Sequence, residues 1–312
     1  MNRRIAFIAM MTALAAAPAL AGDYRAPRNA YGAPDFDGLW SMTSLTELER
    51  PDEFKTLVVD EKEAAAYEKA HRNKPPSFAD NEVGGGESEW WERDTGLAKI
   101  RGQYRTSWIV SPADGQVPIS PEAKAFYKTR GETRKTHIDN PEDRNLSERC
   151  LDPGTPPFIN FGNSDFFQVV QTKDQIALVS EYDHDVRIVR MDGGAQHPAP
   201  GTRQWRGDSI GRWQGETLVI DTTNFMAPEV DDPKKDPRSD MHIVERMTRI
   251  SPTEMIYEFV VSNPSVQIQD MRGEMLVHVS NSAIYESTCH EGNYALEHIL
   301  AGARQQDSKA KP

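Results

Sequence analysis

Alternating hydrophobic and polar positions dominate the middle of the chain, from residue 166 to 225, and predict consecutive antiparallel strands. The strands expected in this stretch cover residues 166–171, 176–182, 187–191, 208–213 and 217–222. Short polar or glycine-containing segments separate them and predict tight turns, as at Gly215 and Glu216. We therefore expect this stretch to form the centre of the fold.

The flanking sequence predicts further strands and a few helices. Strands are expected at residues 105–110, 242–250, 254–261 and 276–279, and helices at residues 60–72, 121–129 and 284–300. Many short strands with few helices predict a mostly β fold, which is an antiparallel barrel or a sandwich. We favour a calycin- or lipocalin-like barrel with a few peripheral helices. Gly38 and Trp40 resemble the Gly-x-Trp of lipocalin-like barrels, whose indole closes the barrel floor, although a buried tryptophan of another β fold is the alternative.

The first 21 residues have the parts of a secretory signal peptide. A charged start precedes an apolar run from Ile5 to Leu20, and small residues end the segment at Ala21, where we expect cleavage. The run is shorter than the roughly 20 residues that a membrane-spanning helix needs. We therefore expect a periplasmic protein with no membrane partner, in which residues 22–312 form a single barrel domain with an N-terminal helical and loop elaboration.

The composition narrows the set of partners. The formal net charge is −12 at pH 7, and cleavage removes the positive charges of Arg3 and Arg4. This acidity argues against nucleic acid and anionic membranes, because both need clustered Lys and Arg. The chain has no Gly-rich nucleotide loop, nucleophile elbow or His-Glu-x-x-His motif, so we expect no cofactor. A homodimer and a bound metal are left open.

The chain has two cysteines, Cys150 and Cys289. In an oxidising compartment such a pair is more often joined than free, so we predict a disulfide, with two buried thiols as the alternative. A structural zinc site is disfavoured, because His290 follows Cys289 directly and no further cysteine lies nearby.

Several segments resemble a family of exported, mostly uncharacterised proteins of sphingomonads and acidobacteria. They are residues 148–150, 181–187, 205–213, 244–246 and 289–294, which together span the second half of the chain. Sphingomonad enzymes that cleave formaldehyde from lignin-derived phenylcoumaran dimers are similar to this group. The resemblance implies a periplasmic carbon–carbon lyase with a small aromatic substrate. A lipocalin-like binding protein for a small aromatic or lipidic ligand is the alternative, and a hydrolase is the third.

A lyase of this kind needs only acid–base groups, because a base removes an alcohol proton, a C–C bond breaks and an acid protonates the departing phenolate. His184 is the favoured base, since the ordinary pKa of histidine lies near neutral pH and two aspartates flank it. Tyr182 and Arg187 would stabilise the phenolate charge. The candidate catalytic residues are Tyr182, His184, Asp185, Arg187, Asp208, Glu245 and His290. The aromatic residues expected to line the substrate cavity are Trp90, Trp91, Trp213 and Tyr257.

These residues also have structural interpretations. A turn between Tyr182 and Val186 would make the cluster around His184 a solvated loop. Glu245 and Arg246 would be a surface ion pair, and His290 would be a histidine at a helix end. The adjacent Trp90-Trp91 pair would be two partly buried surface indoles.

Overall fold

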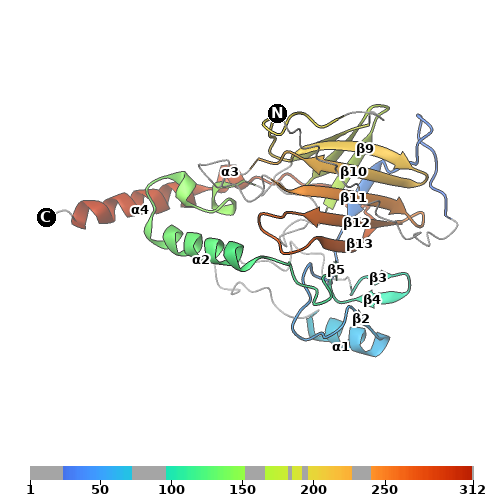
Figure 1. Ribbon diagram of the computed structural model, residues 1–312, viewed down its shortest axis with the longest axis horizontal. Helices are drawn as coiled ribbons and strands as arrows, with labels where there is room; N and C mark the ends of the chain where they lie inside the picture. The colour runs from blue at the N-terminus through green and yellow to red at the C-terminus, as the bar shows by residue number, and fades with distance from the viewer. Residues whose placement is uncertain are drawn as a thin grey trace, which may run out of the picture.

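The computed structural model describes residues 24–71, 96–151, 166–181, 185–191, 196–226 and 240–310. Figure 1 shows a β-barrel from which helices α2, α3 and α4 extend to one side, while α1 lies beside a small second sheet. The barrel strands are β1 (Gly38–Ser41), β6 (Phe166–Gln171), β7 (Gln175–Ser180), β8 (Val186–Arg190), β9 (Asp208–Gln214), β10 (Thr217–Thr223), β11 (His242–Arg249), β12 (Glu254–Ser262) and β13 (Met271–Val279). The other elements are β2 (Val58–Val59), β3 (Lys99–Ile100), β4 (Gln103–Arg105), β5 (Ile109–Ser111), α1 (Glu61–His71), α2 (Pro121–Thr136), α3 (Cys289–Gly292), α4 (Tyr294–Ala310) and the short 3-10 helices η2 (Pro141–Asp143) and η3 (Ser147–Arg149).

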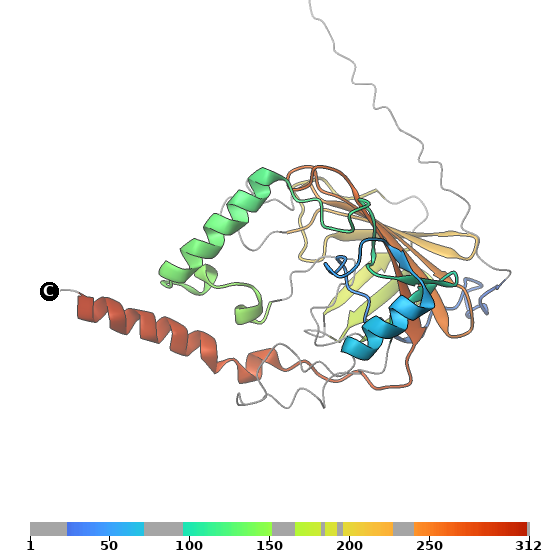
Figure 2. The same cartoon turned by 90° about the horizontal axis from the view of Figure 1, so that it is seen from below.

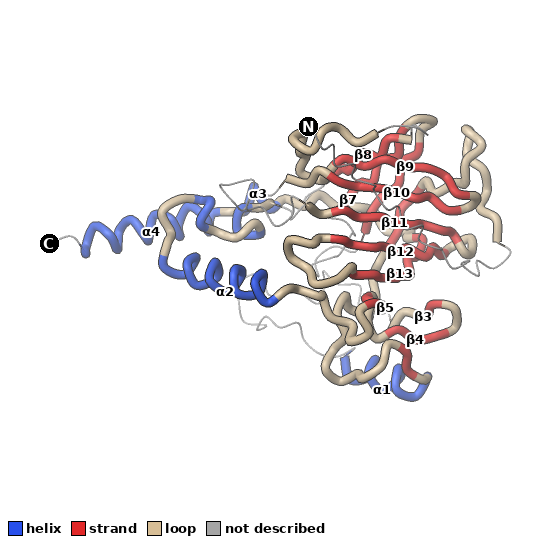
Figure 3. The backbone as a smooth tube through the Cα atoms, viewed as in Figure 1, coloured by secondary structure: helices blue, strands red, loops and turns tan. Residues whose placement is uncertain are grey.

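Nine strands close the barrel in the order β1-β6-β7-β8-β9-β10-β11-β12-β13, and β13 pairs back onto β1. The expected barrel is therefore confirmed. Its neighbouring strands are antiparallel except β8 and β9, which run parallel with Val189 opposite Ser209. The expected antiparallel pairing is thus confirmed except at this pair, and the barrel is mixed. The connection over residues 191–207 has the dozen or more residues that a parallel crossover needs, so β9 can start again at the same end as β8. Figure 3 shows β8 and β9 next to each other in the barrel.

Most predicted elements form within about two residues of their expected bounds, but four differ by more. The strand expected at 276–279 begins at Met271. The strand expected at 105–110 is divided into β4 and β5, because the Thr106 and Ser107 hydroxyls between them bond to backbone carbonyls instead of facing a partner strand. The helix expected at 121–129 continues to Thr136. The helix expected at 284–300 begins only at Cys289, breaks at Asn293 and then runs to Ala310.

The barrel interior is filled with large apolar side chains. Residues two apart along each strand face inward, so that Ile243 and Met247 of β11 meet Met255 and Phe259 of β12 in one core cluster. Trp40 of β1 belongs to the same cluster and is buried, as both interpretations of this residue require, and its indole N–H donates to the Phe36 carbonyl at 3.0 Å. The period-two pattern thus fixes the inner face of the barrel.

An ion pair joins one of the outer parts to the barrel, and a disulfide joins two outer segments to each other. The small sheet β2-β4-β3 packs with α1 around Val59 and Tyr67. It is tied to β13 by the Arg105 guanidinium, which lies 2.9 Å from Glu274. At the other side, Cys150 and Cys289 form a disulfide with a Cα–Cα distance of 5.6 Å. The predicted disulfide is confirmed.

Helices α2 and α4 extend away from the barrel on the same side (Figure 2). Of the helices in the described ranges, none has both the length and the apolarity to cross a bilayer. The predicted signal peptide, residues 1–21, lies outside the described residues.

Candidate functional site

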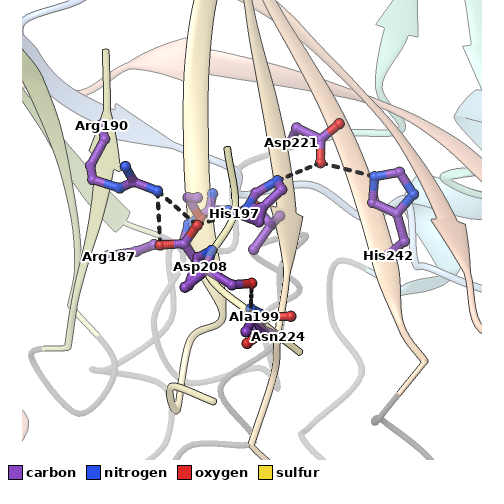
Figure 4. A network of polar contacts seen from close by, with 11 residues as sticks. Arg187, Arg190, His197, Ala199, Asp208, Asp221, Asn224 and His242 are labelled. Atoms are coloured by element: carbon purple, nitrogen blue, oxygen red, sulfur yellow. Dashed lines mark hydrogen bonds and ion pairs between the residues drawn. The ribbon is translucent and has the colours of Figure 1, made fainter. Parts of the chain in front are cut away.

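Polar side chains gather on the outer face of the barrel across β8, β9, β10 and β11. Figure 4 shows them as a connected network of hydrogen bonds and ion pairs. We call these residues the outer network, and they are Arg190, His197, Asp208, Asp221 and His242. The four that belong to strands point outward, because the residues next to them in sequence point inward. Ser209, next to Asp208, and Ile220, next to Asp221, are examples of these inward residues. His197 comes from the loop between β8 and β9.

His197 lies between the two aspartates of the outer network. Its Nδ1 is 2.7 Å from an Asp208 carboxylate oxygen, and its Nε2 is 3.1 Å from Asp221 Oδ1. A carboxylate only accepts hydrogen bonds, so both contacts are satisfied when both ring nitrogens carry protons. His197 is therefore suited to connecting the two carboxylates and holding them in place.

The loop that carries His197 is fixed to the end of β10. The side-chain amide of Asn224 donates to the Pro198 carbonyl at 3.0 Å, and the Asn224 backbone carbonyl accepts the Gln204 N–H at 3.0 Å. Asn224 has a φ of 59°, a left-handed conformation that asparagine tolerates better than most residues. This local turn chemistry places His197 over the strands.

His242 is the accessible end of the outer network. Its Nε2 lies 2.9 Å from Asp221 Oδ1, and 45% of its side chain is exposed. The hydrogen bond to Asp221 raises the pKa of His242 against the effect of burial, and the charges of Asp221 and Asp270 add to it. Burial raises the pKa of Asp221, but hydrogen bonds from His242 and His197 outweigh it and lower that pKa.

This arrangement can perform proton transfer at His242. When the ring is neutral, Asp221 favours the tautomer with the proton on Nε2, and the Nδ1 lone pair is then available to a ligand. At the other end, the Arg190 guanidinium lies 2.9 Å from Asp208 and brings a positive charge to the site. The outer network thus combines a base, an orienting carboxylate and a cation.

A second polar group lies inside the barrel. Arg187 of β8 donates two hydrogen bonds to Glu245 of β11, at 2.5 and 2.8 Å, and the Tyr257 hydroxyl of β12 donates to the same carboxylate at 2.6 Å. Burial alone lowers the pKa of Arg187, but the charge and hydrogen bond of Glu245 raise it above its ordinary value, so the pair is ionic. The exposed fractions of Arg187, Glu245 and Tyr257 are 2%, 0% and 1%.

The structure therefore brings three predicted residues together, Arg187, Glu245 and Tyr257, but in the closed interior. The interpretation of Glu245 and Arg246 as a surface ion pair is wrong, because they point to opposite faces of β11 and Arg246 donates instead to Gln214 at 2.9 Å.

The remaining described candidates lie apart. Asp208 belongs to the outer network, and Asp185 accepts a 2.5 Å hydrogen bond from Arg206. His290 is exposed in α3. Trp213 packs edge-on against Phe36 at the opposite end of β9, with the ring centroids 5.3 Å apart. The other four candidates lie outside the described residues, and they are Trp90, Trp91, Tyr182 and His184.

Four residues of the outer network were not among the predicted site residues, namely Arg190, His197, Asp221 and His242. A signal was present for one of them, because Asp221 is a charged residue within the apolar strand expected at 217–222. His197 had no such signal, since it lies in a Pro-rich connection.

Within the described part of the chain, no group of three or more His, Cys, Asp and Glu side chains has the arrangement of a metal site. Comparisons with protein-family models, with curated proteins and with solved structures find no match for this chain.

Proposed function

We propose that this protein is a cofactor-independent enzyme that performs acid–base chemistry at the outer network. The observation that carries this proposal is the contact between His242 and Asp221, at 2.9 Å, in a histidine whose ring is nearly half exposed. A base of this kind contributes about 10² to 10⁴-fold to a rate when it is positioned against the proton that it removes.

The reaction that we propose is the release of formaldehyde from a small aromatic dimer in the periplasm. His242 takes the proton of a primary alcohol, the O–H electron pair becomes the C=O bond of formaldehyde, and the broken C–C bond supplies a new C=C bond. The ring ether then opens, and its electron pair leaves on a phenolate that takes the proton back. Every electron pair stays within the substrate, so no oxidant, reductant or cofactor is consumed.

The filled barrel favours an enzyme over a carrier that holds its ligand inside. A lipocalin-like carrier needs an empty apolar interior, whereas the described interior holds the core cluster and the buried Arg187–Glu245 pair. We retain the relationship to calycins as part of the proposal, supported by Trp40 in the first barrel strand. The Cys150–Cys289 disulfide supports the proposed periplasmic location, because disulfides persist in oxidising compartments.

The test is a formaldehyde assay on the purified protein with a phenylcoumaran dimer that carries a primary alcohol. His242→Gln keeps a donor near Asp221 but removes the base, and we expect it to lower kcat by about 10² to 10⁴-fold. In the wild type, kcat should rise with pH through the pKa of His242, which lies above its ordinary value of 6.5. His298→Gln, which removes an exposed histidine on α4, is the matched control and should leave kcat within about twofold.

Three results would contradict this assignment. Tight binding of the dimer without product would favour a carrier. A different product would replace the lyase with another reaction. Unchanged turnover in a folded His242→Gln variant would remove the outer network from the chemistry, and His184→Gln would become the next variant to measure.

A further inference from the structure

A cavity of about 440 Å³ lies at the end of the barrel where β8 and β9 finish. It is formed by the turn between β6 and β7, by Met191 after β8, by the last residues of β9 and by Tyr31 from the N-terminal segment. Pockets for small molecules typically have volumes of ~300–1,000 Å³. Asp208 of the outer network is four residues before Arg212 along β9, which corresponds to ~13 Å of strand, so the cavity is a separate site.

The charged residues that line this cavity are both cations. Lys173 comes from the β6–β7 turn and Arg212 from the outward face of β9, and the lining contains no Asp or Glu. Among the described residues, the side chains of Lys173 and Arg212 have no hydrogen-bond or ion-pair partner. Acidic residues close in sequence include Asp174, directly after Lys173, and Glu216, four residues after Arg212. Both are outside the lining, and Glu216 is paired with Arg28. In a chain with a net charge of −12, two unpaired cations at one cavity favour an anionic ligand.

The rest of the lining suits a flat apolar group. Trp213 is held edge-on by the buried Phe36, and Met191 also lines the cavity. Gly211 is needed for this arrangement, because a Cβ at this position would come within 2.3 Å of the Met191 sulfur. A thioether and an indole are favourable neighbours for an aromatic ring.

The side-chain amide of Gln171, which lines the cavity, already makes two hydrogen bonds within the protein. Gln171 Oε1 accepts the Phe36 N–H at 2.5 Å, and its Nε2 donates to the Pro34 carbonyl at 3.1 Å. These bonds fix the N-terminal segment against the barrel and close one side of the cavity. Recognition of a charged ligand group therefore depends on Lys173 and Arg212.

We propose that this cavity binds a small aromatic anion, with its ring against Trp213 and Met191 and its carboxylate or phenolate at Arg212 and Lys173. Binding here does not depend on the acid–base chemistry at His242.

The test is calorimetric titration of the full chain with benzoate at low ionic strength, together with benzyl alcohol as the neutral analogue and acetate as the anion without a ring. We expect benzoate to bind best and to bind more weakly as salt is added. Arg212→Gln and Lys173→Gln should each weaken benzoate binding by about tenfold, as expected for the loss of a charged hydrogen bond. Both side chains are exposed, so the substitutions should leave the fold intact.

Arg272→Gln is the matched control, because it removes an exposed arginine of β13 that does not line the cavity. It should leave benzoate affinity within about twofold, and so should His242→Gln. The proposal is overturned if benzoate does not bind, if benzyl alcohol or acetate binds equally well, or if Arg272→Gln weakens binding as much as Arg212→Gln does. The benzoate titration and the formaldehyde assay are separate measurements on His242→Gln. The anion site and the proposed lyase activity can therefore be refuted independently of each other.

Discussion

The buried pair of Arg187 and Glu245 allows the sharpest test of how this barrel is held together. Glu245→Gln keeps the shape of the side chain but removes its charge, so that Arg187 stays charged in the interior without its counter-ion. Removing one partner of a buried ion pair typically costs about 3 to 5 kcal/mol, because the remaining charge has lost its compensation. Glu245 is fully buried and accepts three hydrogen bonds, so we expect a loss within this range.

Replacing the whole group should have a different effect. Arg187→Met combined with Glu245→Leu removes both charges, and Tyr257→Phe must be added because the tyrosine hydroxyl would otherwise lose its acceptor in the core. Apolar replacement of a complete buried ion pair is often neutral or stabilising by about 1 to 4 kcal/mol. The triple variant should therefore be far more stable than Glu245→Gln alone.

The assay is urea unfolding followed by tryptophan fluorescence, with a thermal melt as a second measurement. A loss of 3 to 5 kcal/mol should lower Tm by roughly 6 to 20 °C for a domain of this size. Glu286→Gln, at an exposed carboxylate, is the control and should change the free energy of unfolding by less than about 0.5 kcal/mol. The reasoning is refuted if Glu245→Gln costs less than about 1 kcal/mol, or if the triple variant is as unstable as the single one.

Two further predictions concern the disulfide and a carboxylate of β12. Reduction of the Cys150–Cys289 disulfide, which spans 139 residues, should lower the free energy of unfolding by about 2 to 5 kcal/mol, and equal urea midpoints with and without reductant would contradict this. Burial, with the charge of Glu274, raises the pKa of Glu258 above 4.5, so the folded state holds this proton more tightly than the unfolded chain and loses stability as pH rises through the folded pKa. Glu258→Gln should therefore be more stable than the wild type at pH 7 and equal to it near pH 4. A urea midpoint at pH 7 that is unchanged or lower would show that the ionised carboxylate does not destabilise the fold.

The sequence alone determined the local elements of this protein. The strands of two hairpins, β9–β10 and β11–β12, were predicted because each hairpin depends on residues close in sequence. In both, a period-two pattern lies on either side of a short turn. The same period-two pattern puts Ile243, Glu245 and Met247 on one face of β11, and all three are buried in the structure. It also predicted a barrel, since many short strands must close or stack to bury their apolar faces.

The partners across the barrel were decided only by the tertiary structure. Arg187 and Glu245 are 58 residues apart, and periodicity shows that each faces inward without showing that β8 and β11 meet across the interior. His197 reaches Asp208 and Asp221 because the connection between β8 and β9 crosses back over the strands, which also makes that pair parallel. The two-residue period of a strand determines which face each side chain points to. The partners of that side chain are determined by how the barrel closes and where the loops run, and both depend on contacts between residues distant in sequence.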